Sequence, residues 1–170
     1  MLKILTKIFK TGVITENVVT DEALDKIGAD VKRIVDKRFR GSLSIREVDS
    51  GSCNGCELEI NALNNPYYDI ERFGIHFVAS PRHADLLLVT GPVSRHMEEA
   101  LRRTYAATPE PKWVIAVGDC GADGGEFGIS YASAGAVSNI IPVDLVIRGC
   151  PPSPTELLTG VIALLSKQEH

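Results

Sequence analysis

The stretch Asp85-Leu-Leu-Leu-Val-Thr90 decides the fold class, because four apolar residues follow one another in it without a polar break. A strand with one solvated face would alternate apolar and polar residues, so this run indicates a strand that is covered on both faces. Similar short runs, rich in apolar or β-branched residues, lie at residues 43–48, 75–79, 114–117 and 143–147. We therefore predict a sheet of buried strands.

Helical segments alternate with these strands, at residues 57–63, 97–105 and 155–165. Alternating strands and helices favour a three-layer α/β domain with a mainly parallel, flavodoxin-like sheet. Two N-terminal helices are predicted before the first strand. One is the amphipathic segment of residues 1–10, and the other is capped by Thr20 and ends near Phe39. We assign residues 1–40 to an N-terminal helical extension and residues 41–170 to the α/β domain.

The segment of residues 1–10 places lysines and apolar side chains on different faces of one helix. A basic amphipathic helix can lie on a membrane surface or dock on a partner. A helix this short can equally pack on its own domain as a terminal element. The sequence leaves these alternatives open.

The composition limits the possible partners and compartments. A length of 170 residues indicates about one domain, and 18 basic against 22 acidic residues leave no positive excess for binding nucleic acid. No apolar run is long enough to span a membrane, and the N-terminus lacks the features of a secretory signal. We predict a chain without a transmembrane segment in the reducing cytoplasm. Cysteines in that compartment, of which this chain has four, are more often metal ligands or catalytic groups than cystines.

The four cysteines are Cys53, Cys56, Cys120 and Cys150, and each follows the end of a predicted strand. The carboxyl ends of parallel strands share one edge of a sheet, where ligands characteristically bind. Glycines accompany the cysteines in every one of these loops and allow the backbone to approach a bulky ligand. We predict that one site collects all four thiols.

Four thiolates fit either a tetrahedral zinc ion or a [4Fe-4S] cluster. Structural zinc usually takes its cysteines from two close pairs, whereas here one pair is joined by single cysteines 64 residues (120 minus 56) and 30 residues (150 minus 120) further on. This spacing favours the cluster. A thioredoxin-like exchange pair would leave Cys120 and Cys150 without a role, and buried structural thiols remain the fourth interpretation.

The chain resembles the small, proximal-cluster subunit of group 4 membrane-bound energy-converting [NiFe]-hydrogenases, which is homologous to the corresponding subunit of respiratory complex I. The resemblance covers residues from about Val48 to Leu165. The stretches that carry it are Gly-Ser-Cys53-Asn-Gly-Cys56-Glu-Leu-Glu59-Ile, Tyr68-Asp69-Ile-Glu-Arg72-Phe-Gly74, Ser80-Pro-Arg82-His-Ala-Asp85, Thr90-Gly-Pro92-Val, residues 118–125, Ile141-Pro-Val-Asp144 and Gly149-Cys150-Pro-Pro152.

The resemblance implies that Cys53, Cys56, Cys120 and Cys150 bind one [4Fe-4S] cluster. The cluster would relay electrons between the nickel-iron site of a large partner subunit and further iron-sulfur subunits. The C-x-x-C spacing favours the hydrogenase branch, of the hydrogenase-3, hydrogenase-4, Ech or CO-induced type. A complex I-type quinone oxidoreductase is the alternative, and a non-catalytic zinc-binding interaction module is an alternative of another class.

The resemblance also implies a peripheral place on the cytoplasmic side of the inner membrane. The expected partners are the hydrogenase large subunit, a ferredoxin-like iron-sulfur subunit and the membrane subunits of the complex, with no nucleic acid. Glu57 and Glu59 are candidates for proton transfer or for holding the partner, although carboxylates in the first turn of a helix are also favoured by its dipole.

Four other polar residues stand out in the sequence. Asp119 and Arg148 depart from the family pattern, in which a small residue and a proline are usual. Asp69 and Arg72 are predicted to form a structural pair, because residues three apart on a helix are neighbours.

Overall fold

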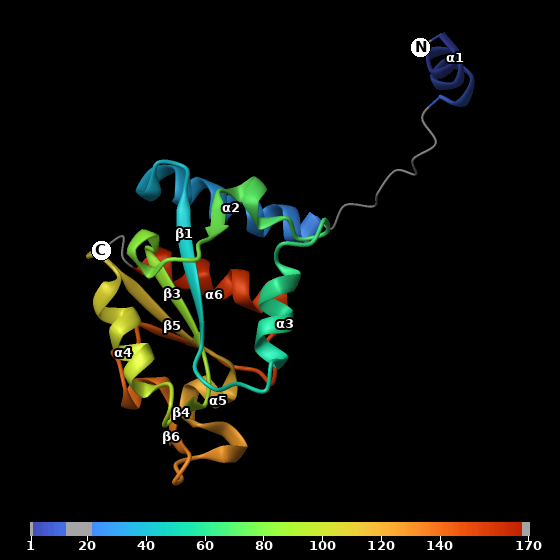
Figure 1. Ribbon diagram of the computed structural model, residues 1–170. Coiled ribbons are helices and arrows are strands. Elements are labelled where there is room, and N and C mark those ends of the chain that lie inside the picture. The colour runs from blue at the N-terminus through green and yellow to red at the C-terminus, as the bar shows by residue number, and fades with distance from the viewer. Residues whose placement is uncertain (1, 13–21, 168–170) are drawn as a thin grey trace.

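The computed structural model contains a five-stranded sheet in the order β2-β1-β3-β5-β7, in which every neighbouring pair is parallel (Figure 1). The structure describes residues 2–12 and 22–167. Counted within this sheet alone, the strand order is the flavodoxin-like order 2-1-3-4-5. The strands are β1 (Leu43–Asp49), β2 (Ile75–Phe77), β3 (Leu86–Thr90), β5 (Trp113–Val117) and β7 (Leu145–Ile147). The predicted three-layer α/β fold is confirmed.

Six α-helices occur within the described residues. They are α1 (Leu2–Thr11), α2 (Glu22–Phe39), α3 (Gly55–Ala62), α4 (Glu98–Ala107), α5 (Gly118–Asp123) and α6 (Pro154–Lys167). Strands β4 (Val93–Ser94) and β6 (Ser133–Gly135) form a separate antiparallel pair. Single 3-10 turns lie at η1 (Ile70–Phe73), η2 (Pro81–His83), η3 (Gly125–Phe127) and η4 (Val137–Asn139).

The predicted elements agree with the observed ones to within two residues at most ends. The strand predicted at residues 143–147 begins two residues later, at Leu145. Helix α5 was not predicted, because its glycine-rich sequence gives a weak helical signal. The predicted cap Thr20 lies outside the described residues.

Strand β3 is covered on both faces, as its unbroken apolar run predicts. Leu86 and Leu88 pack with residues of α2 and α6, whereas Leu87 and Val89 pack with residues of α4 and η4 on the other side. All five residues of the strand are buried. The sheet is therefore the middle layer of the domain.

Helix α2 packs into the same core as α6. Leu24, Val31, Ile34 and Val35 are buried there, and the Arg38 guanidinium donates a hydrogen bond to the carbonyl oxygen of Leu165. The hydrophobic core thus continues across residue 40, where the sequence predicts the end of an N-terminal extension.

Asp69 and Arg72, predicted to form a structural pair, are joined by a hydrogen bond from the backbone N–H of Arg72 to the carbonyl oxygen of Asp69 at 3.1 Å, and their side chains form no ion pair. The Arg72 guanidinium lies 3.5 Å from the Asp25 carboxylate of α2 and stacks over the Phe73 ring instead. Asp69 has a left-handed backbone before η1, so the two residues do not share a helix face. No helix within the described residues is both long and apolar enough to cross a membrane.

Candidate functional site

The four cysteines line one cavity of about 120 Å³ at the carboxyl edge of the sheet. Cys53 and Cys56 follow β1, Cys120 lies in α5 after β5, and Cys150 follows β7. Gly91 also lines the cavity and follows β3, the strand that lies between β1 and β5 in the sheet. Strands β1 and β3 are also the point where the strand order reverses, which is where flavodoxin-like folds bind ligands. The predicted convergence of the four thiols is therefore present in the structure.

The first cysteine loop is shaped by a turn directly after β1. The Asp49 carboxylate accepts hydrogen bonds from the backbone N–H groups of Gly51 and Ser52, at 2.8 and 2.9 Å. Asn54 then adopts a left-handed conformation with φ 72°, and α3 begins at the next residue. This turn leaves Cys53 exposed and places Cys56, which is half-buried, in the first turn of α3.

Helix α5, which carries Cys120, and the loop that carries Cys150 are joined by a reciprocal pair of hydrogen bonds. The backbone N–H of Asp119 donates to the carbonyl oxygen of Gly149 at 2.9 Å, and the N–H of Gly149 donates to the Asp119 carboxylate at 3.2 Å. Arg148 reinforces this connection, because its guanidinium donates to the Asp123 carboxylate at 2.6 Å and lies 3.7 Å from that of Asp119. We call these contacts the Asp119–Arg148 bracket.

Sequence reasoning singles out Asp119 and Arg148 only as departures from a family pattern. Their contact joins residues that are about 30 positions apart, so spacing gives no signal for it. The bracket connects the segment that carries Cys120 to the segment that carries Cys150.

Glycine is required where the backbone passes close to the thiols. A Cβ atom on Gly118 would lie 2.7 Å from the Cys56 sulfur, and one on Gly125 would lie 2.7 Å from the Cys120 sulfur. Both glycines also have positive φ angles, of 78° and 51°. Side chains at these positions would occupy the space around the sulfur atoms.

The thiols influence one another electrostatically. The pKa of Cys56 is raised to about 12, chiefly by burial and then by negative charge on Glu57 and on the other three cysteines. Burial also raises the pKa of Cys120, followed in size by the effects of Cys150 and Cys53. Four thiolates around one cavity repel one another, so a positively charged group bound among them would stabilise their ionised form.

The four thiols match in type and number the donors that a zinc ion or a [4Fe-4S] cluster takes. Among residues 2–12 and 22–167, no three His, Cys, Asp or Glu side chains are placed to hold one metal ion. A tetrahedral zinc ion needs sulfur atoms about 2.3 Å from a common point, whereas a cubane cluster separates its four cysteine ligands around an inorganic core. The four thiols around the cavity have the type and number of ligands that such a cluster requires.

Glu57 is buried beside this site, with 6% of its surface exposed. Neither of its carboxylate oxygens has a hydrogen-bond partner among the described residues. Its charge also contributes, after burial, to raising the pKa of Glu47 on β1. Sequence reasoning places Glu57 in the first turn of α3 but does not anticipate its burial, because burial depends on how the helix packs in the fold. Glu59, by contrast, is half-buried.

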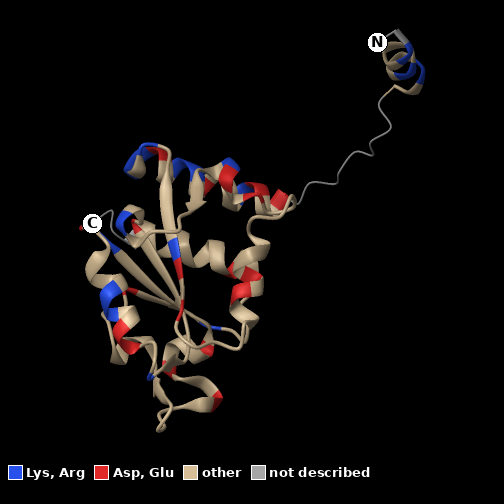
Figure 2. Ribbon diagram, in the orientation of Figure 1, with Lys and Arg blue, Asp and Glu red and all other residues tan. Residues whose placement is uncertain are grey.

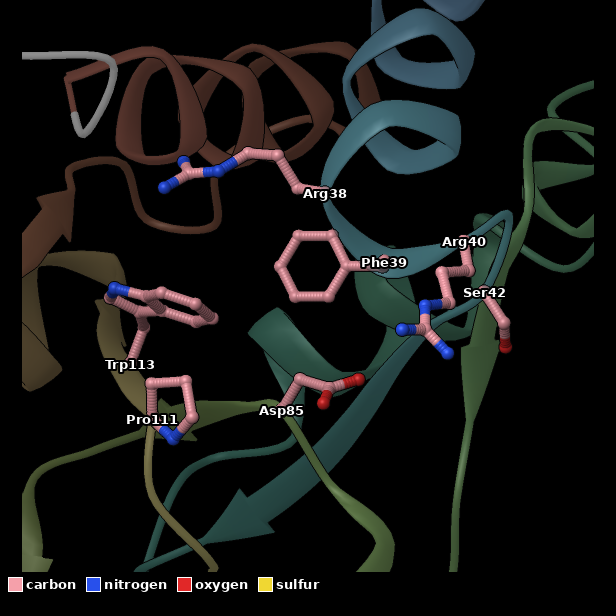
Figure 3. A pocket seen from close by; sticks show the side chains of 7 residues that line it. All are labelled: Arg38, Phe39, Arg40, Ser42, Asp85, Pro111 and Trp113. Atoms are coloured by element: carbon pink, nitrogen blue, oxygen red, sulfur yellow. The ribbon is translucent and has the colours of Figure 1, made fainter.

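A larger cavity, of about 580 Å³, lies at the opposite edge of the sheet. Figure 3 shows its lining, which includes Arg38, Phe39 and Trp113 and contains none of the predicted site residues. The Phe39 and Trp113 rings meet edge to face at 5.6 Å, and the Arg38 guanidinium lies 6.0 Å from the Trp113 ring centre. These contacts pack the end of α2 against β5, and the lining of this cavity contains no cysteine.

Comparison with known proteins relates the chain to redox complexes. The family model described as NADH ubiquinone oxidoreductase, 20 kDa subunit, matches residues 53–164, a range that includes all four cysteines. A probable membrane-bound hydrogenase subunit, mbhJ of Pyrococcus furiosus, is 51% identical over 120 residues, which are 71% of this chain and 72% of that protein.

Formate hydrogenlyase subunit 7 of Escherichia coli is 43% identical over 150 residues, covering 86% of this chain. The aligned region spans only 59% of that longer protein. A solved structure of the membrane-bound sulfane sulfur reductase, an archaeal respiratory membrane complex, matches with a TM-score of 0.67 and 34% identity. That match covers 80% of this chain and 77% of the other.

Proposed function

The chain belongs to the family of the 20 kDa subunit of NADH ubiquinone oxidoreductase, a family of oxidoreductase subunits, and from this membership we propose its function. It is the electron-transfer small subunit of a membrane-bound [NiFe]-hydrogenase complex and holds one [4Fe-4S] cluster. The identity of 51% to a hydrogenase subunit supports the hydrogenase branch.

The observation that carries the cofactor assignment is the single cavity lined by Cys53, Cys56, Cys120 and Cys150. When bound, a [4Fe-4S] cluster accepts and releases one electron at a time. The four thiolates would hold the cluster, and Gly118 and Gly125 leave room around the sulfur atoms. The Asp119–Arg148 bracket connects the segments that carry Cys120 and Cys150.

The exposed side of the site supports a large partner subunit. Cys53 and Cys150 are exposed in the chain alone, and exclusion of water is one of the factors that set a cluster's potential. Large apolar side chains are also exposed on α3 and in the segment after α5, namely Leu58, Phe127, Ile129 and Tyr131. Exposed apolar groups of this kind mark protein interfaces. A hydrogenase large subunit carrying nickel-iron would cover both.

The other predicted partners belong to the same proposal. They are a ferredoxin-like iron-sulfur subunit and membrane subunits, with the chain peripheral on the cytoplasmic side of the inner membrane. The names of the hydrogenase relative and of the solved structure, which both refer to membranes, support this location. Glu57 and Glu59 remain candidates for proton transfer or for contact with the large subunit.

Anaerobic reconstitution of the full chain with iron and sulfide tests the cofactor. We expect about four iron atoms per chain, broad absorbance in the visible range and an EPR signal after reduction. Zinc in place of iron, at about one ion per chain and without visible absorbance, would overturn the assignment in favour of an interaction module.

A complex I-type quinone oxidoreductase is the second candidate, and the description of the matching family favours it. The intact complex separates the two. Hydrogen uptake, with nickel in the co-purified large subunit, is the result expected here. Quinone reduction by a complex that lacks nickel would support the second candidate instead.

A further inference from the structure

Helix α1 exposes its apolar side chains to solvent. Ile4, Leu5, Ile8 and Phe9 are 65%, 52%, 58% and 86% exposed, respectively. Figure 1 shows this helix standing apart from the α/β body. An isolated helix of ten residues is marginal in water, so an exposed apolar face of this kind gains stability only against another surface.

The charges of α1 are arranged opposite its apolar face. With about 3.6 residues per turn, Lys3, Lys7 and Lys10 lie together on the face that is opposite Ile4, Leu5, Ile8 and Phe9. Residues 2–12 include no aspartate or glutamate. In Figure 2 the charged residues of this helix are all blue, which marks Lys and Arg, whereas α2, α3 and α4 each carry red acidic residues. Helix α1 is thus the only one of these four helices with a uniformly positive polar face.

We propose that α1 lies in the interface of an anionic lipid bilayer, with its apolar face among the acyl chains and its lysines at the headgroups. A short amphipathic helix with a basic polar face and large apolar residues opposite it has the pattern of interfacial membrane binding. The negative surface of an anionic bilayer attracts each lysine and explains why the polar face carries one sign of charge.

The inference rests on the proposed function in one respect, which is that the complex is attached to a membrane. It adds the element through which this chain meets the lipid. Four apolar side chains and three lysines provide reversible binding, since stable anchoring usually takes two signals. The second signal is the attachment of the α/β domain to the other subunits.

Vesicle binding by the purified full-length chain tests the inference directly. Flotation is measured with phosphatidylcholine vesicles, with and without phosphatidylglycerol, at low and high salt. We expect at least about tenfold tighter binding to the anionic vesicles, and loss of that difference at high salt. Replacing all three lysines by glutamine should abolish the preference for phosphatidylglycerol.

Two exposed phenylalanines distinguish vesicle binding by α1 from nonspecific hydrophobic adsorption of the chain. Phe9 and Phe127 are both exposed, at 86% and 60%, and only Phe9 lies in α1. Phe9→Ser should weaken binding to anionic vesicles by about tenfold, because it removes a large buried side chain from the lipid interface. Phe127→Ser should bind within about twofold of the unmodified chain, because it leaves the apolar area of α1 unchanged.

Equal losses in both variants, or no binding of the unmodified chain to anionic vesicles, would overturn the inference. A second result would also overturn the inference. If the unmodified chain did not bind vesicles and the Phe9→Ser chain were lost from the detergent-purified complex, the apolar face of α1 would be covered by a protein subunit. A chain that binds anionic vesicles but takes up no iron would instead contradict the proposed cofactor and leave this inference intact.

Discussion

The two edges of the central sheet differ in size and in chemistry. The carboxyl edge holds a small cavity of about 120 Å³ lined by four cysteines from the three segments that follow β1, β5 and β7. The amino edge holds a cavity of about 580 Å³ lined by Arg38, Arg40, Asp85 and aromatic residues. The smaller cavity gathers four side chains of one type that can bind metal, whereas the larger one is lined by residues of mixed chemistry.

Parallel strands make the two edges of a sheet unequal. Every loop that follows a strand in this sheet reaches the same edge, so side chains from the loops after β1, β5 and β7 can meet there. Residues at the amino edge precede the strands, and here they pack the end of α2 against β5. If the two edges are independent, substitutions at the carboxyl edge should lower the amount of iron bound per folded chain. Substitutions at the amino edge should leave it unchanged.

Cys150→Ala should cause the largest loss. With one of four thiolates removed from an exposed position, we expect less than about a quarter of the wild-type iron after reconstitution. His96→Ala is the control, since His96 is exposed and does not line the cavity. Metal analysis after gel filtration measures both, and equal iron in the two variants would refute the role of Cys150.

Gly118→Ala should cause the next largest loss, because its Cβ would lie 2.7 Å from the Cys56 sulfur. We expect about half of the iron or less, since the methyl group displaces a ligand. Gly41→Ala is matched in backbone strain, with φ 91° against 78°, but it lies at the amino edge and its Cβ meets only the Asp36 carboxylate at 3.5 Å.

Both alanine variants should unfold more easily, by about 1–2 kcal/mol, because alanine disfavours a positive φ. Thermal unfolding of the apo chains checks this part. If Gly41→Ala lost as much iron as Gly118→Ala, the loss would come from backbone strain and not from the cavity.

Asp119→Ala should weaken the cluster without preventing its assembly. Removal of this carboxylate leaves the N–H of Gly149 without its acceptor and breaks one contact of Arg148. We expect iron to transfer to a chelator about tenfold faster, as for other outer-shell changes. Asp119→Asn keeps an acceptor oxygen and should lie closer to wild type.

Glu99→Ala serves as the comparison for surface charge. Glu99 also forms an exposed ion pair, with Arg103 at 2.7 Å, but it is part of α4 and not of the site. A chelation rate for Asp119→Ala that matches that of Glu99→Ala would show that the bracket does not contribute to cluster retention.

Trp113→Phe should have the smallest effect on iron. Trp113 contacts Phe39 and Arg38 at the amino edge, so we expect a loss of about 1–2 kcal/mol in unfolding free energy. Iron per folded chain should stay at the wild-type level. A large loss of iron in this variant would mean that the two edges are not independent.

Much of the fold could be predicted because its signals are local. The unbroken run from Asp85 to Thr90 indicates a strand covered on both faces, and β3 is buried at every residue. Local signals are weaker where glycine dominates, so α5 is not predicted although Cys120 lies in it. The side-chain partner of Arg72 was also not predicted, because Asp25 lies on α2, far from Arg72 along the chain.

The order of residues along the chain was enough to identify the four thiols and the edge at which they meet, since cysteines that follow parallel strands must end on the same side of the sheet. Contacts between segments that are distant in the chain became evident only from the three-dimensional packing. These are the Asp119–Arg148 bracket, the burial of Glu57 and the close approach of Gly118 to Cys56. The physical reason is that periodicity and strand propensity are set by neighbouring residues, whereas burial and contact depend on how the layers pack.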